Sequence, residues 1–73
     1  MNKEVRGYLS KIFTECDRLK NEGIEMNISI AYHVNEIEVY NISNRCEGMG
    51  DLHWSDDDWQ HDAEEILNKL KEM

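Results

Sequence analysis

Proline is missing from this chain of 73 residues, cysteine occurs only twice, and no long apolar run is present. The lack of proline, together with 40% apolar and 33% charged residues, is typical of a compact domain rather than a disordered tail. Two cysteines are too few for the disulfide framework of a small secreted domain. A membrane span would need about eighteen or more consecutive apolar residues, and no signal peptide is recognisable. We therefore expect one cytoplasmic domain covering residues 1–73.

Basic residues are scarce over most of the chain. Between Asn21 and Asn68 there are twelve acidic side chains and one basic side chain, Arg45, and seven of the acids fall within Asp51–Glu65. The net charge is -8. Such a surface repels nucleic acid and anionic membranes and attracts basic protein surfaces. We therefore expect a basic protein partner and no direct contact with nucleic acid or membrane.

No motif with a recognised chemistry stands out, and a glycine-rich phosphate loop is absent. His53, Asp57 and His61 have a spacing that metal ligands could use, but a chain so rich in acids produces such spacings by chance. The expected alternative is that His61 pairs with Asp57 or Asp58. A cysteine-histidine-acid hydrolase would need a sheltered cleft, for which so small a domain has little room. We predict no catalytic residues, no metal and no cofactor, and do not expect an enzyme.

An amphipathic helix is predicted over Asn2–Glu22, because the apolar residues recur every three or four positions. They are Val5, Tyr8, Leu9, Ile12, Phe13, Cys16 and Leu19. Gly23 follows where a helix often ends in a left-handed residue. Cys16 on this stripe is expected to act as a small hydrophobic side chain, and a disulfide with Cys46 is not expected.

Two strands should follow, because the apolar period changes to two over Ile24–His33 and again over Glu36–Ile42. The short connection predicts an antiparallel hairpin that turns at Val34-Asn35 or Asn35-Glu36. Either turn places the apolar side chains of both strands on one face. The inward residues are then Ile24, Met26, Ile28, Ile30, Tyr32, Ile37 and Val39.

The polar stretch Ser43–Gly50 contains two glycines and indicates a loop with a turn. After it, Asp51–Trp54 is either a short third strand or more loop. The predicted fold class is therefore a two-layer α+β domain of order α-β-β-(β)-α. Its hairpin or three-stranded antiparallel sheet should carry both helices on one face.

A second helix is predicted to begin near Asp56, with Ser55 as its N-cap. Trp54 and Trp59 are expected to pack together across this start as a hydrophobic staple. The inward residues again recur at helical spacing. They are Trp59, Ala63, Ile66, Leu67, Leu70 and Met73.

The acids around the start of the second helix are the main candidate site for partner binding. They are Asp51, Asp56, Asp57, Asp58, Asp62 and Glu65. The alternative is that the Asp triplet caps the helix and the other acids form a solvated face. One or two acids suffice for capping. The excess therefore favours a surface whose carboxylates imitate phosphates and bind in a partner's groove lined by Lys and Arg.

The outer face of the predicted sheet is a second candidate, because Ala31, Tyr40 and Ile42 make it more apolar than solubility requires. Pairing of strand edges or faces through it could give a homodimer. The alternative is that Tyr40 and Ile42 are covered by the stretch Ser43–Gly50.

In its order of helix, strands and helix, the chain resembles the double-stranded RNA-binding domain. That family has basic residues at the start of its last helix, whereas Asp56–Asp58 lie there in this chain, so RNA binding is not expected. In size and acidity the chain is similar to small acidic proteins of phages and mobile elements, among them anti-CRISPR inhibitors, and to acidic immunity proteins that neutralise nucleases. The resemblance implies an inhibitor or adaptor that binds a nucleic-acid-processing enzyme. The alternative is a self-associating structural or accessory protein.

Overall fold

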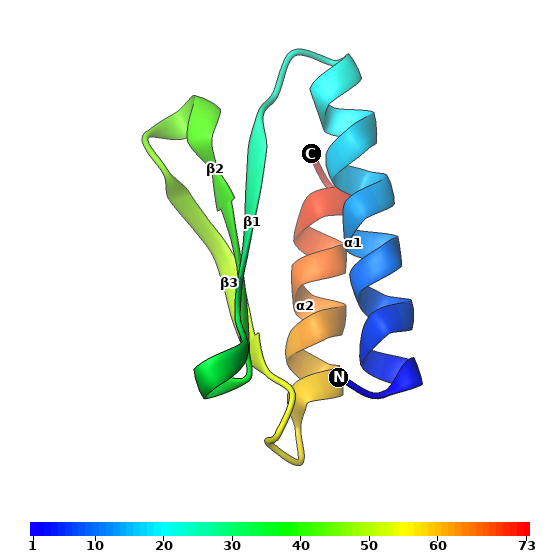
Figure 1. The fold of residues 1–73 in the computed structure, drawn as a ribbon. Helices are drawn as coiled ribbons and strands as arrows, with labels where there is room; N and C mark the ends of the chain where they lie inside the picture. The colour runs from blue at the N-terminus through cyan, green and yellow to red at the C-terminus, as the bar shows by residue number, and fades with distance from the viewer.

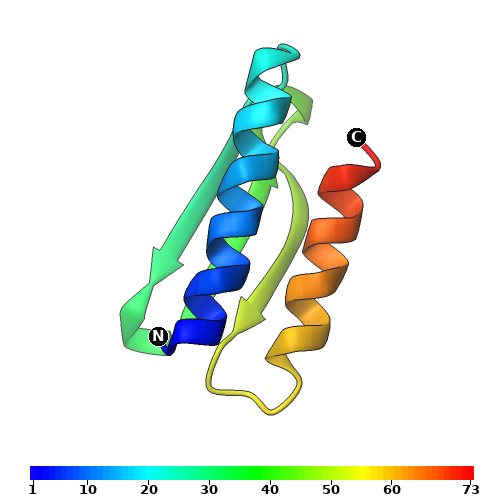
Figure 2. The ribbon, with the colours of Figure 1, turned by 90° about the vertical axis from the view of Figure 1, so that its right-hand side faces the viewer.

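The computed structural model describes all 73 residues and has the predicted two-layer α+β architecture (Figure 1). The elements in order are α1 (Lys3–Asn21), β1 (Met26–Ala31), β2 (Glu36–Asn41), β3 (Glu47–His53) and α2 (Trp59–Lys71). The strands form one antiparallel sheet in the order β1-β2-β3. Both helices lie on the same face of this sheet, with α1 nearer β1 and α2 alongside β3 (Figure 2).

Helix α1 agrees with the prediction to within one residue at each end, because both ends carry strong capping signals. The side-chain oxygen of Asn2 accepts a hydrogen bond from the Val5 amide at 2.8 Å. At the other end Gly23 adopts a φ of 87°, which glycine reaches without steric cost. The chain reversal lets the Ile24 amide donate to the Leu19 carbonyl at 2.9 Å, as in a Schellman motif.

The hairpin between β1 and β2 has the register that the alternation predicts. Ile30 lies opposite Ile37, and Ile28 lies opposite Val39. The connection is a 3-10 turn followed by Asn35 in the left-handed conformation, with a φ of 55°. The apolar residues of both strands therefore share the face toward the helices.

The predicted inward position of Tyr32 and the predicted staple between Trp54 and Trp59 are wrong, whereas Trp59 packs against the core as predicted. Tyr32 lies in the 3-10 turn and is 67% exposed, because β1 ends at Ala31, the residue before it. Its ring meets Trp54 edge to face at 5.7 Å. Trp59 likewise meets Tyr8 of α1 at 5.6 Å, so the two tryptophans pack against different tyrosines and form no staple.

Strand β3 exists and is longer than predicted, since it begins at Glu47 within the expected loop. Its register with β2 shifts between Val39 and Tyr40, which makes Met49 the extra residue of a β-bulge. The side chain of Met49 is buried. The neighbouring glycines, which suggest a turn in the sequence, serve this bulge instead.

Helix α2 begins three residues later than predicted, at Trp59. Ser55 is not its N-cap: Asp58 holds that position and makes no side-chain cap hydrogen bond. The Asp56 carbonyl accepts from the Trp59 amide at 3.4 Å, so the Asp triplet forms a turn before the helix. Aspartate has a low helix propensity, so a run of three does not favour an earlier helix start.

The core lies between the sheet and the helices and contains twelve buried apolar side chains. They are Val5, Leu9, Ile12, Leu19, Ile37, Val39, Met49, Leu52, Ala63, Ile66, Leu67 and Leu70. The single buried polar side chain is Asn41, whose Oδ1 has no hydrogen-bond partner. No helix has both the length and the apolar character that crossing a membrane requires.

Candidate functional site

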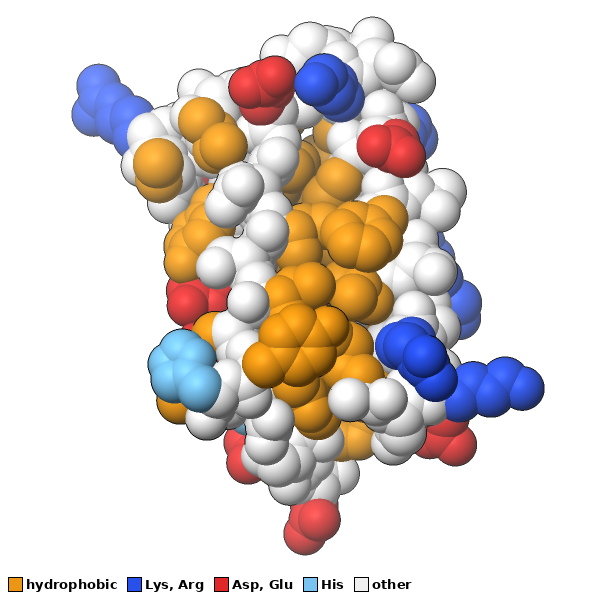
Figure 3. Space-filling model, in the orientation of Figure 1, with side chains coloured by type: hydrophobic (Ala, Val, Ile, Leu, Met, Phe, Trp, Pro, Cys, Tyr) orange, Lys and Arg blue, Asp and Glu red, His pale blue; other side chains and the backbone are white.

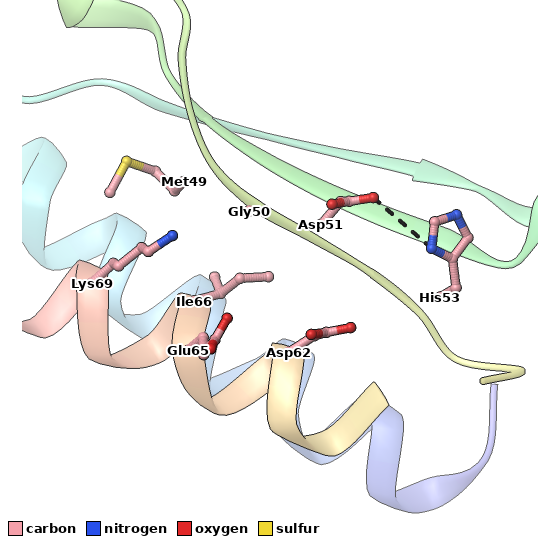
Figure 4. Close-up of a pocket in the computed structure, with 8 residues that line it drawn as sticks. All are labelled: Met49, Gly50, Asp51, His53, Asp62, Glu65, Ile66 and Lys69. Carbon is pink, nitrogen blue, oxygen red and sulfur yellow. Dashed lines mark ion pairs between the residues drawn. The ribbon is translucent and has the colours of Figure 1, made fainter. Parts of the chain in front are cut away.

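A groove runs between β3 and the outer flank of α2, and most of the residues that line it are polar (Figure 4). Its floor depends on Gly50, which has a φ of 139° and lets α2 approach the strand closely. A Cβ at this position would lie 2.8 Å from Cγ1 of Ile66. The groove is lined by Met49, Gly50, Asp51, His53, Asp62, Glu65, Ile66 and Lys69.

Three of the predicted partner-binding acids meet at this groove. Asp51 comes from β3, while Asp62 and Glu65 stand three residues apart on α2 and therefore on one helical face (Figure 4). Glu65 also pairs with His61 at 3.0 Å, so the predicted pairing of that histidine with the Asp triplet is wrong. Lys69 lines the groove one turn further along α2 but forms no ion pair.

The other three predicted acids lie apart from the groove, in the exposed turn that precedes α2. The side chains of Asp56, Asp57 and Asp58 make no hydrogen bond and no ion pair. The six acids thus form two adjoining groups around the first half of α2. We call these six residues the acidic surface.

Asp51 also belongs to a cluster on the outer face of the sheet, which the sequence alone does not indicate. Glu38 lies directly opposite Asp51, and Glu36 lies opposite His53. The imidazole of His53 contacts two of these acids. Its Nε2 is 3.3 Å from Glu36, and its Nδ1 is 3.9 Å from Asp51. The alternating acids of Glu36–Tyr40 are the sequence signal for this cluster. Its other members can be identified only when the register between β2 and β3 is known.

Crowding of carboxylates changes the titration of this cluster. Burial raises the pKa of Glu36 above its ordinary value, and a hydrogen bond with Asp51 and the charge of Glu38 raise it further, while His53 opposes the shift. The pKa of Tyr40 is raised mainly because its hydroxyl donates a hydrogen bond to Glu38. Like charges face each other here across a strand pair, an arrangement that destabilises a sheet.

The cluster also offers the best set of metal donors in the chain. Glu36, Asp51 and His53 each present one ligand atom, and these atoms lie within 4.8 Å of one another. Carboxylate oxygen and imidazole nitrogen suit a divalent cation such as zinc. In the present arrangement, however, each ring nitrogen of the histidine faces a different carboxylate. The three metal ligands that the sequence suggests, His53, Asp57 and His61, are not brought together.

The cysteines show no sign of nucleophilic chemistry. Both are free thiols, Cys16 half-buried and Cys46 exposed. Burial raises the pKa of Cys16, and the nearby charges of Asp17 and Glu15 raise it further, which disfavours the reactive thiolate. Neither thiol is hydrogen-bonded to a histidine.

The residues of the predicted dimer face lie on or beside the outer side of the sheet. Ala31 and Tyr40 are half-buried, and Ile42 is 46% exposed. Ser43–Gly50 is not a loop folded over them, since most of it belongs to a 3-10 turn and to β3. The face also carries the acids of the outer cluster, so its apolar surface is interrupted by charge.

Comparison of the chain with models of protein families, with curated proteins and with solved structures gives no match.

Proposed function

We propose that this protein is a small protein-binding module that docks its acidic surface on a basic partner. The observation that carries the proposal is that none of the six carboxylates of the acidic surface is paired with a Lys or Arg of the chain. Two of them contact a histidine, Asp51 with His53 and Glu65 with His61, so most of the negative charge is available to a partner. Unpaired surface carboxylates attract a basic surface over roughly a Debye length, about 8 Å at physiological ionic strength.

The distribution of basic residues supports the proposal. Five of the eight lie on α1, and several of these have partners of their own. Arg18 pairs with Glu15 at 3.0 Å and with Glu22 at 2.9 Å. Lys11 stands over the ring of Tyr8, 5.1 Å from its centroid. Of the other three, Lys69 and Lys71 lie in the last turn of α2, at the end away from the Asp triplet, and neither forms an ion pair with the acidic surface.

A groove lined by Lys and Arg that normally holds a nucleic acid is the kind of partner surface that this arrangement suits. Asp62 and Glu65 present two carboxylates, with the spacing of one helical turn, to donors that otherwise bind phosphates, and the Asp triplet adds three more before the helix. An inhibitor or adaptor of a nucleic-acid-processing enzyme, including one of phage or mobile-element type, would work in this way. Complementary charge mainly accelerates association and makes the affinity sensitive to salt.

Matched charge variants test the proposal. Asp57→Asn, Asp58→Asn, Asp62→Asn and Glu65→Gln together remove four charges from the acidic surface. The control removes four charges elsewhere, through Glu4→Gln, Asp17→Asn, Glu47→Gln and Glu72→Gln. Binding to a panel of purified basic nucleic-acid enzymes, measured at low and high salt, should be lost in the first variant and kept in the second. Equal loss in both variants would show that only net charge matters and would refute a specific docking surface.

A further inference from the structure

The edge formed by β1 is open, and apolar side chains are visible in the space between this strand and α1 (Figure 3). Figure 3 looks onto this edge, and the apolar strip follows β1 over much of its length. The strand supplies three half-buried apolar residues to it, Met26, Ile28 and Ile30. A strip of this kind beside an unpaired strand is a typical site of contact with another chain.

Phe13 of α1 adds to the strip from the other side. Tyr8 marks the flank of α1 that faces α2, because its hydroxyl donates to Glu64 and its ring meets Trp59. Phe13 follows five residues later, about 140° further around the helix, and so lies on the flank toward β1. It is 45% exposed, whereas the residues at the centre of the helix stripe are buried.

The backbone of β1 is prepared for a further strand. The Glu25 carbonyl accepts a hydrogen bond from the Ile42 amide at 2.9 Å and therefore points toward β2. Backbone groups alternate along an antiparallel strand, so those of Asn27 and Ser29 also point toward β2. The amides and carbonyls of Met26, Ile28 and Ile30 consequently face the open edge. These are the same residues whose side chains form the apolar strip.

We propose that β1 pairs with β1 of a second copy of this chain, around a two-fold axis at Ile28. In this register Ile28 lies opposite Ile28 of the second copy, and Met26 lies opposite Ile30. The three residues with free backbone groups then meet in three hydrogen-bonded pairs, which form about six hydrogen bonds. Because the axis is perpendicular to the sheet, all four helices lie on one face of a six-stranded sheet, and the two apolar strips become continuous.

The absence of charge on β1 makes a second copy a suitable occupant, although the net charge of each chain is -8. β1 itself carries no charged residue, and the polar residues on its outer side, Asn27 and Ser29, lie opposite each other in the paired strands. Such an uncharged, regular edge lacks the features that normally prevent self-association. The acidic groove lies at β3, the opposite edge of the sheet, so the dimer keeps the two grooves far apart.

The two α1 helices of the dimer run antiparallel and provide a further complementary contact. A strand rises about 3.3 Å per residue and a helix about 1.5 Å. Counted from the turn at Gly23, Ile28 is therefore level with the middle of α1. The two-fold axis then brings Arg6 of one copy toward Asp17 of the other. Both side chains are exposed and have no ion-pair partner within the chain.

Sedimentation equilibrium from low micromolar to millimolar concentration tests the dimer. Phe13→Glu should raise the dissociation constant by about tenfold or more, because it places a charge in the apolar strip. Ile42→Glu is the matched control: Ile42 is 46% exposed but belongs to the outer side of the sheet, and its variant should dimerise normally. A strict monomer throughout this range would overturn the proposal. So would a dimer that Ile42→Glu weakens and Phe13→Glu does not.

The register has its own test, which uses only exposed residues of α1. Arg6→Asp and Asp17→Arg should each weaken the dimer by a few fold, as expected for exposed ion pairs, and the double variant should restore it. In a background of Cys16→Ser and Cys46→Ser, Ile28→Cys should form a disulfide between two copies upon oxidation, whereas Ser29→Cys should not. A dimer in which the charge swap fails to restore affinity and Ile28→Cys does not cross-link would refute pairing through β1.

Discussion

The two edges of this small sheet differ in how closely a helix covers them. At β3, the contact between Gly50 and Ile66 holds α2 against the strand, and the bulge at Met49 and the charge of Asp51 interrupt the edge. At β1, the strand is regular and uncharged, and α1 leaves apolar side chains half-exposed. Bulges, charges and a covering helix are the features that protect an edge from other chains. One edge of the sheet is therefore protected against strand pairing, while the other is available for it.

The difference in packing should appear first in the response to truncation of apolar side chains. Ile66→Ala should lower the free energy of unfolding by about 2–5 kcal/mol, because the isoleucine is buried and its removal leaves a cavity. Phe13→Ala should cost less than half as much, because nearly half of that side chain is exposed. Urea unfolding at concentrations where the chain is monomeric measures both values. Equal losses would show that the two helices pack equally closely.

The close approach of α2 to β3 can be tested at its narrowest point. Gly50→Ala should destabilise the fold by about 1–3 kcal/mol, since it combines an unfavourable φ with a clash at Ile66. Gly48→Ala is the control, because a Cβ there meets no atom within 4 Å and its φ is not positive. In an Ile66→Ala background, the loss from Gly50→Ala should shrink. A loss that stays unchanged would assign the whole effect to backbone strain.

The smallest expected effect on stability concerns Glu36, which lies on the central strand β2. The pKa of Glu36 is raised in the folded protein, so the folded state binds its proton more readily than the unfolded state does. The resulting penalty is complete above the folded pKa and disappears as the pH falls below the ordinary value of 4.5. Glu36→Gln should therefore slightly raise the melting temperature at neutral pH and not below that value. Thermal unfolding as a function of pH measures this difference.

Asp57→Asn is the control for that experiment, because it removes the same charge from an exposed side chain without close contacts. Its melting temperature should change less at neutral pH than that of Glu36→Gln. If Glu36→Gln instead lowered the melting temperature at neutral pH, the contact with His53 at 3.3 Å would outweigh the repulsion among the acids.

Local signals were sufficient for much of the fold. The apolar spacing and the capping residues Asn2 and Gly23 predict α1 almost to the residue. The alternation along the two central strands predicts the pairing of Ile30 with Ile37, because a shift by one residue would turn every apolar side chain to the wrong face. In these segments the local preference and the packing of the core agree.

Local signals failed where a distant segment decides the conformation. The sequence predicts too short a third strand because the glycines of β3 resemble a turn, and only pairing with β2 and the approach of α2 give them a place in a strand. The predicted start of α2 is too early because three successive aspartates suit both a helix start and a turn. Tyr32 packs against Trp54 and Trp59 packs against Tyr8, and no short-range sequence pattern predicts contacts between such distant residues.

By itself, the sequence determined the α+β class, the inward residues of most elements and the excess of acid around α2. These properties depend on periodicity and composition, which are local or additive. The tertiary structure decided which acids line the groove, brought Glu36 and His53 together across two strands, and left β1 as an open edge. These properties depend on register and on the distance between a helix and a strand, and packing fixes both only when the whole chain is assembled.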